Sequence, residues 1–122
     1  MTATPGPYAR RGAPVPVMVA DAPAAIPAAA PGLAIIRMER PLHAHEIGAT
    51  CVACESRGNV RVLLFELDEK QRRGLVPPFE RVVIDATEID DVQTVIDALV
   101  PGRQPALGLR DHTVARNFRL AQ

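Results

Sequence analysis

The sequence predicts a small α/β domain built on a three- or four-stranded, mainly parallel sheet with flanking helices. The 122 residues are enough for one domain. Val, Ile, Leu and Ala supply most of the 48% hydrophobic content, with three Phe, one Tyr and no Trp. That composition favours a parallel sheet covered by helices over an antiparallel sandwich. In the second half of the chain, helical and extended patterns alternate, as they do in βαβ units.

Proline and alanine dominate the first third of the chain. Residues 1–14 are rich in Gly, Pro and Ala, and we expect a flexible tail there. A single α/β domain then spans residues 15–122. Its first strand is predicted over residues 15–20 and its second over 33–38, because both are short apolar runs. Between them, residues 21–32 (DAPAAIPAAAPG) are low-complexity sequence, which indicates a linker or an extended segment.

The first predicted helix lies between Asn59 and Gly74. Apolar side chains recur at helical spacing from Val60 to Leu67, and charged residues fill most of the other positions. Asn59 can cap the start of the helix and Gly74 its end. Two prolines at residues 77–78 then forbid further helix.

A buried strand is predicted over residues 81–86, and the most regular amphipathic helix of the chain follows over residues 92–100. Asp90 or Asp91 lies at the start of this helix, where a carboxylate favours the free N–H groups and the helix dipole. Residues 107–122 hold one short apolar run and a weakly amphipathic segment.

The charge balance and the cysteine count exclude several classes of protein. Fourteen basic and 14 acidic residues leave no electrostatic footprint for nucleic acid or for an anionic membrane. No uninterrupted apolar run reaches about 18 residues, so we expect no membrane span. Arg10 and Arg11 precede an apolar stretch that a signal peptide could also explain, but prolines interrupt it. Two cysteines are too few for a secreted disulfide scaffold, and we expect a cytoplasmic protein.

Two histidines and two cysteines lie within twelve residues and form a candidate metal site. His43, His45, Cys51 and Cys54 together supply two imidazoles and two thiolates, a complete tetrahedral set for Zn²⁺ or another divalent transition metal. The spacing is short for a structural zinc site, and no second C-x-x-C is present. Two surface histidines with two reduced, packed cysteines are the alternative, and a redox dithiol is a further one.

A group of polar residues follows the predicted strand at residues 81–86. Asp85, Thr87 and Glu88 come at its carboxyl end, and this edge of a parallel sheet is where nucleotide sites are built. The alternative is that Thr87 and Asp90 only cap the next helix.

The chain lacks the loop that would cradle a phosphate. Neither G-x-x-x-x-G-K-S/T nor G-x-G-x-x-G is present. After the first predicted strand come Asp21, whose charge repels phosphate, and Pro23, which has no N–H to donate. The one lysine, Lys70, falls on the polar side of a predicted helix. We therefore expect no bound nucleotide.

Other hydrolytic arrangements are also missing. Asp111 and His112 are neighbours in the last part of the chain, and we expect both on the solvated surface. Ser56 is the only serine, and its surroundings do not form a nucleophile elbow.

Two segments of the chain carry motifs of one protein family. Residues 50–60 read TCVACESRGNV, similar to G-C-I/L-C-C-S/T-x-R-G-D-L. Residues 77–91 read PPFERVVIDATEIDD, similar to P-P-F-D-R-V/I-V/I-I-E-T-T/S-G-x-A-D-P. In these segments the chain resembles the CobW-type GTPases, a family of metallochaperone-like P-loop proteins. The resemblance covers about 50 residues and implies a shortened P-loop-NTPase-like fold.

The departures from the family fall at its functional positions. Ala53 replaces the middle cysteine of C-x-C-C, and Glu88 replaces the glycine that approaches the γ-phosphate. Ala86 replaces the neighbouring Thr, and the phosphate loop is absent. The family's guanine-specificity segment and C-terminal domain have no counterpart in these 122 residues. GTP hydrolysis needs the loop and its Mg²⁺ ligands together, so we expect no enzymatic activity.

The sequence therefore predicts a non-enzymatic binding or assembly protein related to CobW-type GTPases. Cys51 and Cys54, with His43 and His45, would hold a divalent metal. A structural accessory subunit without metal is the first alternative, and a metallochaperone that still binds GTP is the second. We expect a protein partner or a homo-oligomer, and neither nucleic acid nor membrane as a ligand.

Overall fold

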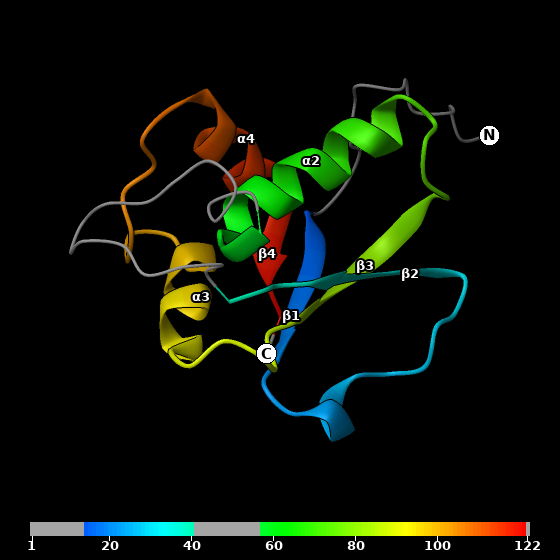
Figure 1. Cartoon of the computed structure of the whole chain (residues 1–122). Coiled ribbons are helices and arrows are strands. Elements are labelled where there is room, and N and C mark those ends of the chain that lie inside the picture. Colours follow the sequence, from blue (N-terminus) through cyan, green and yellow to red (C-terminus); the bar gives the residue numbers. More distant parts are fainter. Residues whose placement is uncertain (1–13, 41–56, 122) are drawn as a thin grey trace.

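The computed structural model describes residues 14–40 and 57–121 (Figure 1). Its strands are β1 (Val15–Ala20), β2 (Gly32–Arg37), β3 (Phe79–Asp85) and β4 (Phe118–Leu120). Its helices are the 3₁₀ turn η1 (Pro23–Ala25), α2 (Val60–Arg72), α3 (Val92–Leu99) and α4 (Leu109–Asn117).

The four strands form one sheet in the order β2-β3-β1-β4, and every pairing in it is parallel. Val17 of β1 pairs with Val82 of β3, and Val15 pairs with Phe118 of β4. The prediction of a small, mainly parallel α/β sheet is confirmed. No helix in the described ranges has both the length and the apolar character needed to cross a membrane.

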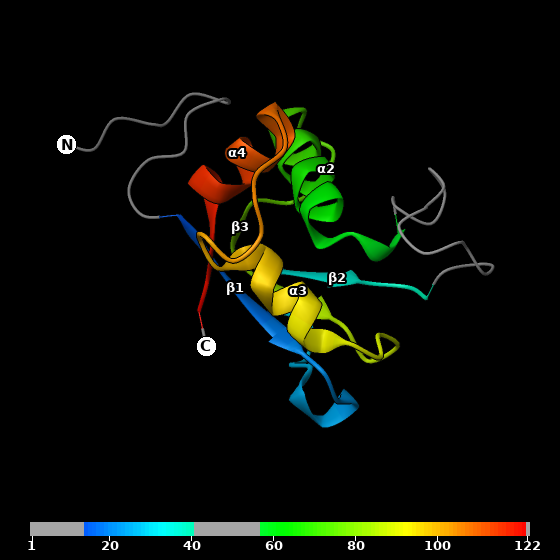
Figure 2. The same ribbon diagram turned by 90° about the vertical axis from the view of Figure 1, so that its left-hand side faces the viewer.

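The core lies between one face of the sheet and the three α-helices. Strand side chains alternate in direction, so Val15, Val17 and Val19 of β1 share this face with Val82 and Ile84 of β3. The helices close it with five buried apolar side chains, Val60, Leu64, Val95, Leu99 and Val114. The three α-helices lie together on one side of the sheet in two views (Figures 1 and 2).

The opposite face of the sheet has no α-helix over it in the described structure. The connection from β1 to β2 runs there, through residues 21–31, and contains only η1. The prediction of a linker or extended segment is confirmed apart from this short turn. Prolines at positions 23, 27 and 31 prevent anything longer.

The predicted helices lie within a residue or two of their observed positions. Asn59 caps α2 by accepting a 3.0 Å hydrogen bond from Arg61 N, and Gly74 follows the helix with a φ of +71°. Asp91, rather than Asp90, caps α3 and accepts a 2.7 Å bond from the Thr94 hydroxyl. The sequence predicts these helix ends because each capping residue bonds a backbone group within one helical turn.

The last two elements were not predicted as such. Residues 109–117 form α4, and the next three residues form β4 beside β1. The ring of Phe118 lies nearly parallel to that of Phe79, with 6.5 Å between their centroids. This contact ties the last strand to the start of β3.

Candidate functional site

The carboxyl ends of β1, β2 and β3 meet at one edge of the sheet. Asp85 of β3 is in register with Ala20 of β1 and with Arg37 of β2. Two backbone bonds extend the pairing past the strand ends, from Ala86 N to Ala20 O at 2.8 Å and from Met38 N to Asp85 O at 2.9 Å. The segments that follow these strands are therefore held side by side, as the sequence predicted for residues 85–88.

The carboxylate of Asp85 is hydrogen-bonded by the loop that follows β3. Its Oδ1 accepts bonds from the Thr87 hydroxyl at 2.7 Å and from Thr87 N at 3.1 Å. These two hydrogen bonds hold the pKa of the Asp85 carboxyl below its usual range. Thr87 thus turns back to Asp85, and Asp91 caps α3 instead, so the alternative reading of Thr87 and Asp90 as its caps is wrong.

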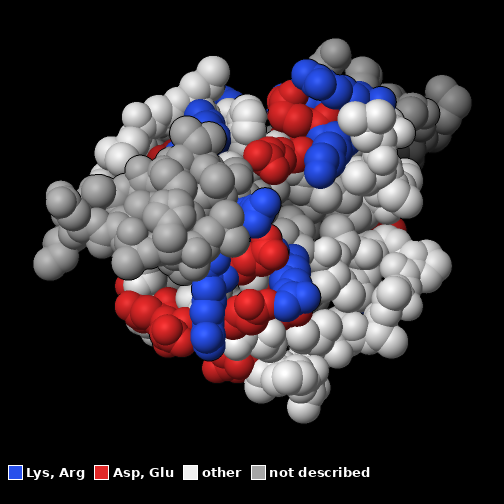
Figure 3. Space-filling view, in the orientation of Figure 1, with Lys and Arg blue, Asp and Glu red and all other residues white. Residues whose placement is uncertain are grey.

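Charged side chains of β2 and of the β3–α3 loop pair with each other at the same edge. Arg37 forms a salt bridge with Glu88, which raises the pKa of the guanidinium. Arg40 donates from Nε to Glu88 O at 2.7 Å and approaches Asp90 Oδ1 at 3.6 Å. Positive and negative side chains are visibly interleaved there (Figure 3). Glu88 is thus a partner of two arginines.

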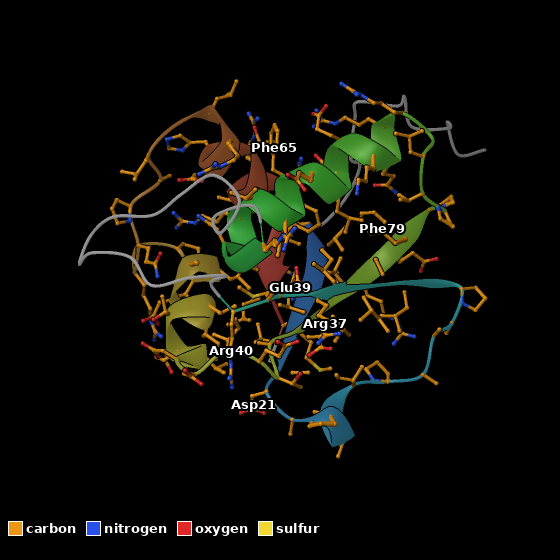
Figure 4. All side chains as sticks on the ribbon, in the orientation of Figure 1. Asp21, Arg37, Glu39, Arg40, Phe65 and Phe79 are labelled. Carbon is orange, nitrogen blue, oxygen red and sulfur yellow. The ribbon has the colours of Figure 1, made fainter. Side chains whose placement is uncertain are left out.

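The segment after β1 offers little to a phosphate. Asp21 is exposed, and Pro23 has no N–H. The N–H groups of Ala25 and Ile26 are bonded within η1, to Ala22 O at 2.9 Å and to Pro23 O at 3.2 Å. A phosphate cradle needs several successive N–H groups that point outward. Asp21 lies at the same end of the sheet as Arg37 and Arg40 (Figure 4).

The predicted metal ligands His43, His45, Cys51 and Cys54 lie outside the described residues. The two points where the described chain leaves and resumes are close together: Glu39 N donates to Arg57 O at 3.0 Å. Within the described ranges, no group of three or more His, Cys, Asp or Glu side chains could hold a metal ion.

Sequence reasoning missed a second polar centre, the ion pair of Arg61 with Asp111. The expectation that Asp111 and His112 both lie on the solvated surface is wrong for Asp111, which is buried, whereas His112 is exposed. Burial alone would raise the pKa of Asp111. The N–H of Leu107 and the charges of Arg110 and Arg61 outweigh it and hold that pKa below its usual range.

Arg61 joins α2 to the loop between α3 and α4. Its guanidinium donates to Ala98 O at 3.0 Å, Gln104 O at 2.9 Å and Pro105 O at 2.9 Å, and reaches Asp111 at 3.4 Å. A mostly apolar pocket of about 480 Å³ lies beside this network, between α3, α4 and β4. These contacts hold the start of α2 against the end of α3 and the loop that follows it.

No protein-family model, curated protein or solved structure matches this chain. The likeness to CobW-type GTPases therefore stays a prediction from the two sequence motifs.

Proposed function

We propose that the protein is a non-enzymatic binding or assembly protein related to the CobW-type GTPases. The observation that carries this proposal is the segment after β1, where a phosphate loop would stand. There the N–H groups of Ala25 and Ile26 are bonded inside η1, Pro23 has none, and Asp21 is negative. A nucleotide phosphate would meet an exposed carboxylate instead of a row of donors.

The paired charges at the same edge support the proposal. Phosphoryl transfer needs cations and Mg²⁺ ligands that are free to face the phosphates. Arg37 is engaged with Glu88, and the Asp85 carboxylate is bonded by Thr87. Recruiting either group for catalysis would first break a contact within the protein.

The kinship with the CobW family rests on the motifs, and the strand arrangement is compatible with it. The segment that contains PPFERVVID forms β3, which lies directly beside β1. A phosphate loop after β1 and an acidic residue after β3 would therefore face one crevice. This chain keeps an acidic residue at the end of β3, Asp85, but has no phosphate loop after β1.

The proposed metal ligands are Cys51, Cys54, His43 and His45, whose donor chemistry suits Zn²⁺. A bound metal would supply a fixed tetrahedral centre for this segment. The bond between Glu39 N and Arg57 O brings the flanks of this segment together, which lowers the entropy lost when its four ligands converge.

Calorimetric titration with GTP and Mg²⁺ tests the non-enzymatic role. We expect no saturable heat, and no phosphate release above the protein-free rate. Saturable GTP binding would overturn the proposal in favour of a residual GTP-binding metallochaperone.

Metal analysis of protein purified without an affinity tag tests the metal part. We expect a near-stoichiometric divalent metal, lost in Cys51→Ser and reduced in His43→Ala. His112→Ala is the matched control, because His112 is the one histidine outside the segment and is exposed on α4. Metal-free protein, or equal loss in the control, would contradict this part alone.

A second candidate function, a structural accessory subunit without metal, is favoured by the sheet face that carries no helix. Met18 and Ile35 on that face are incompletely buried. Parallel sheets are almost always covered on both faces, so this face suits a contact with another chain.

A further inference from the structure

The helix-free face of the sheet carries an apolar row across its middle. Met18, Val83 and Ile35 are in register on three neighbouring strands, and their side chains share one face. Val83, on the central strand of the three, is 4% exposed, and Ile35 is 40% exposed. The row therefore becomes more accessible toward β2, the edge of the sheet.

The chain itself places no α-helix over this row in its described part. The crossover from β1 to β2 passes on this side, where a right-handed connection between parallel strands normally packs a helix. Here residues 21–31 contribute only the three-residue η1. A groove of about 490 Å³ remains between that segment and the strands, lined by Pro16, Met18, Ile26 and Val83 among others.

Two exposed cations flank the apolar row toward the amino ends of the strands. Arg81 on β3 and Arg119 on β4 are exposed, and neither forms an ion pair with any other described residue. Arg81 is in register with Leu33, and Arg119 with Pro16. This flank contrasts with the opposite end of the face, where Arg37 is neutralised by Glu88.

We propose that this face binds an amphipathic helix of a partner protein that carries acidic side chains beside its apolar stripe. Apolar residues at i, i+3, i+4 and i+7 would lie along the row of Met18, Val83 and Ile35. Glutamate or aspartate on one flank would meet Arg81 and Arg119. The partner helix takes the place that a crossover helix usually fills.

A second copy of this chain fits the face less well. A two-fold contact presents the same patch from both sides, so it would bring four exposed arginines into one interface. Asp85, an acidic strand residue on this face, is already bonded by Thr87. Charge complementarity therefore favours an acidic partner over self-association.

The inference rests on the proposed function, since it names a partner for a binding protein. A different experiment tests each of the two proposals. The probes are two fluorescent helical peptides with the same leucine stripe, one flanked by glutamates and one by lysines. Anisotropy titration of the full chain should give a Kd at least about tenfold lower for the glutamate peptide. Arg81→Glu combined with Arg119→Glu should reverse the preference.

Two further variants complete the test. Arg116→Glu on α4 is the matched control, because Arg116 is exposed on the helical layer, and it should leave both affinities unchanged. Ile35→Asp should weaken binding of both peptides, with circular dichroism to verify that the variant is folded.

Three results would overturn the inference. They are no binding of either peptide, equal binding of both, and a dimer in light scattering that Ile35→Asp disperses. The last result would assign the face to a second copy. GTP binding would overturn the proposed function while leaving the peptide preference intact, so the two failures are distinguishable.

Discussion

Replacing Arg61 by methionine should cost about 4 kcal/mol of folding free energy. The side chain is 13% exposed and bonds three backbone carbonyls, those of Ala98, Gln104 and Pro105. At about 1 kcal/mol for each net hydrogen bond, their loss costs about 3 kcal/mol. Asp111, 4% exposed, also loses one of its two arginine partners, and breaking a buried pair costs about 3–5 kcal/mol in total.

Urea unfolding followed by circular dichroism measures this loss. We expect the urea midpoint to fall by about 2–4 M, since domains of this size lose roughly 1–2 kcal/mol per molar urea. Arg116→Met is the matched control, because Arg116 is exposed on α4, and its effect should stay within about 0.5 kcal/mol. A loss below about 1 kcal/mol for Arg61→Met would refute the idea that this residue holds α2 against the α3–α4 loop.

Three further predictions concern stability. Gly74→Ala should cost about 1 kcal/mol in calorimetry, because φ is +71° and the open space around the site leaves backbone strain as the only cost. Leu64→Ala should cost about 3 kcal/mol in urea titrations and Leu107→Ala almost nothing, since Leu64 is fully buried and Leu107 is 84% exposed; equal losses would contradict the assigned core. The Asp111 pKa is lowered on folding from about 3.9, so its contribution is complete above that pH and is lost as the pH falls through the lowered value. Asp111→Asn should therefore reduce the slope of the free energy of unfolding against pH on the acid side. An unchanged slope would contradict the lowered pKa of Asp111.

The parts of the fold that the sequence predicted are those encoded locally. The helix that became α2 has its cap at Asn59 and its apolar stripe within a few turns, and β3 follows two prolines that end any helix. The sequence does not predict β4, because three residues are too few to show the alternation of apolar and polar residues that marks a strand. This segment becomes a strand only by pairing with Val15 to Val17.

The candidate site was predicted in position but not in detail. The sequence placed residues 85–88 at the carboxyl edge, because any strand end in a parallel sheet lies there. Which partner each side chain takes depends on distant segments: Glu88 pairs with Arg37, 51 residues earlier, and Asp111 with Arg61, 50 residues earlier. Such contacts leave no pattern in a short window of sequence.

The position of β1 in the sheet has a consequence for how the chain is made. Both neighbours of β1 follow it at long range, since Val17 pairs with Val82 and Val15 with Phe118. During synthesis this apolar segment precedes both of its partners, so it stays unpaired until residues 79–85 and 118–120 have left the ribosome. Pro16 lies within this segment and has no backbone N–H to donate. The unpaired strand is therefore less able to form a β-ladder with another nascent chain. We therefore expect Pro16, which removes a donor from the β1 ladder, also to reduce aggregation of the unfinished protein.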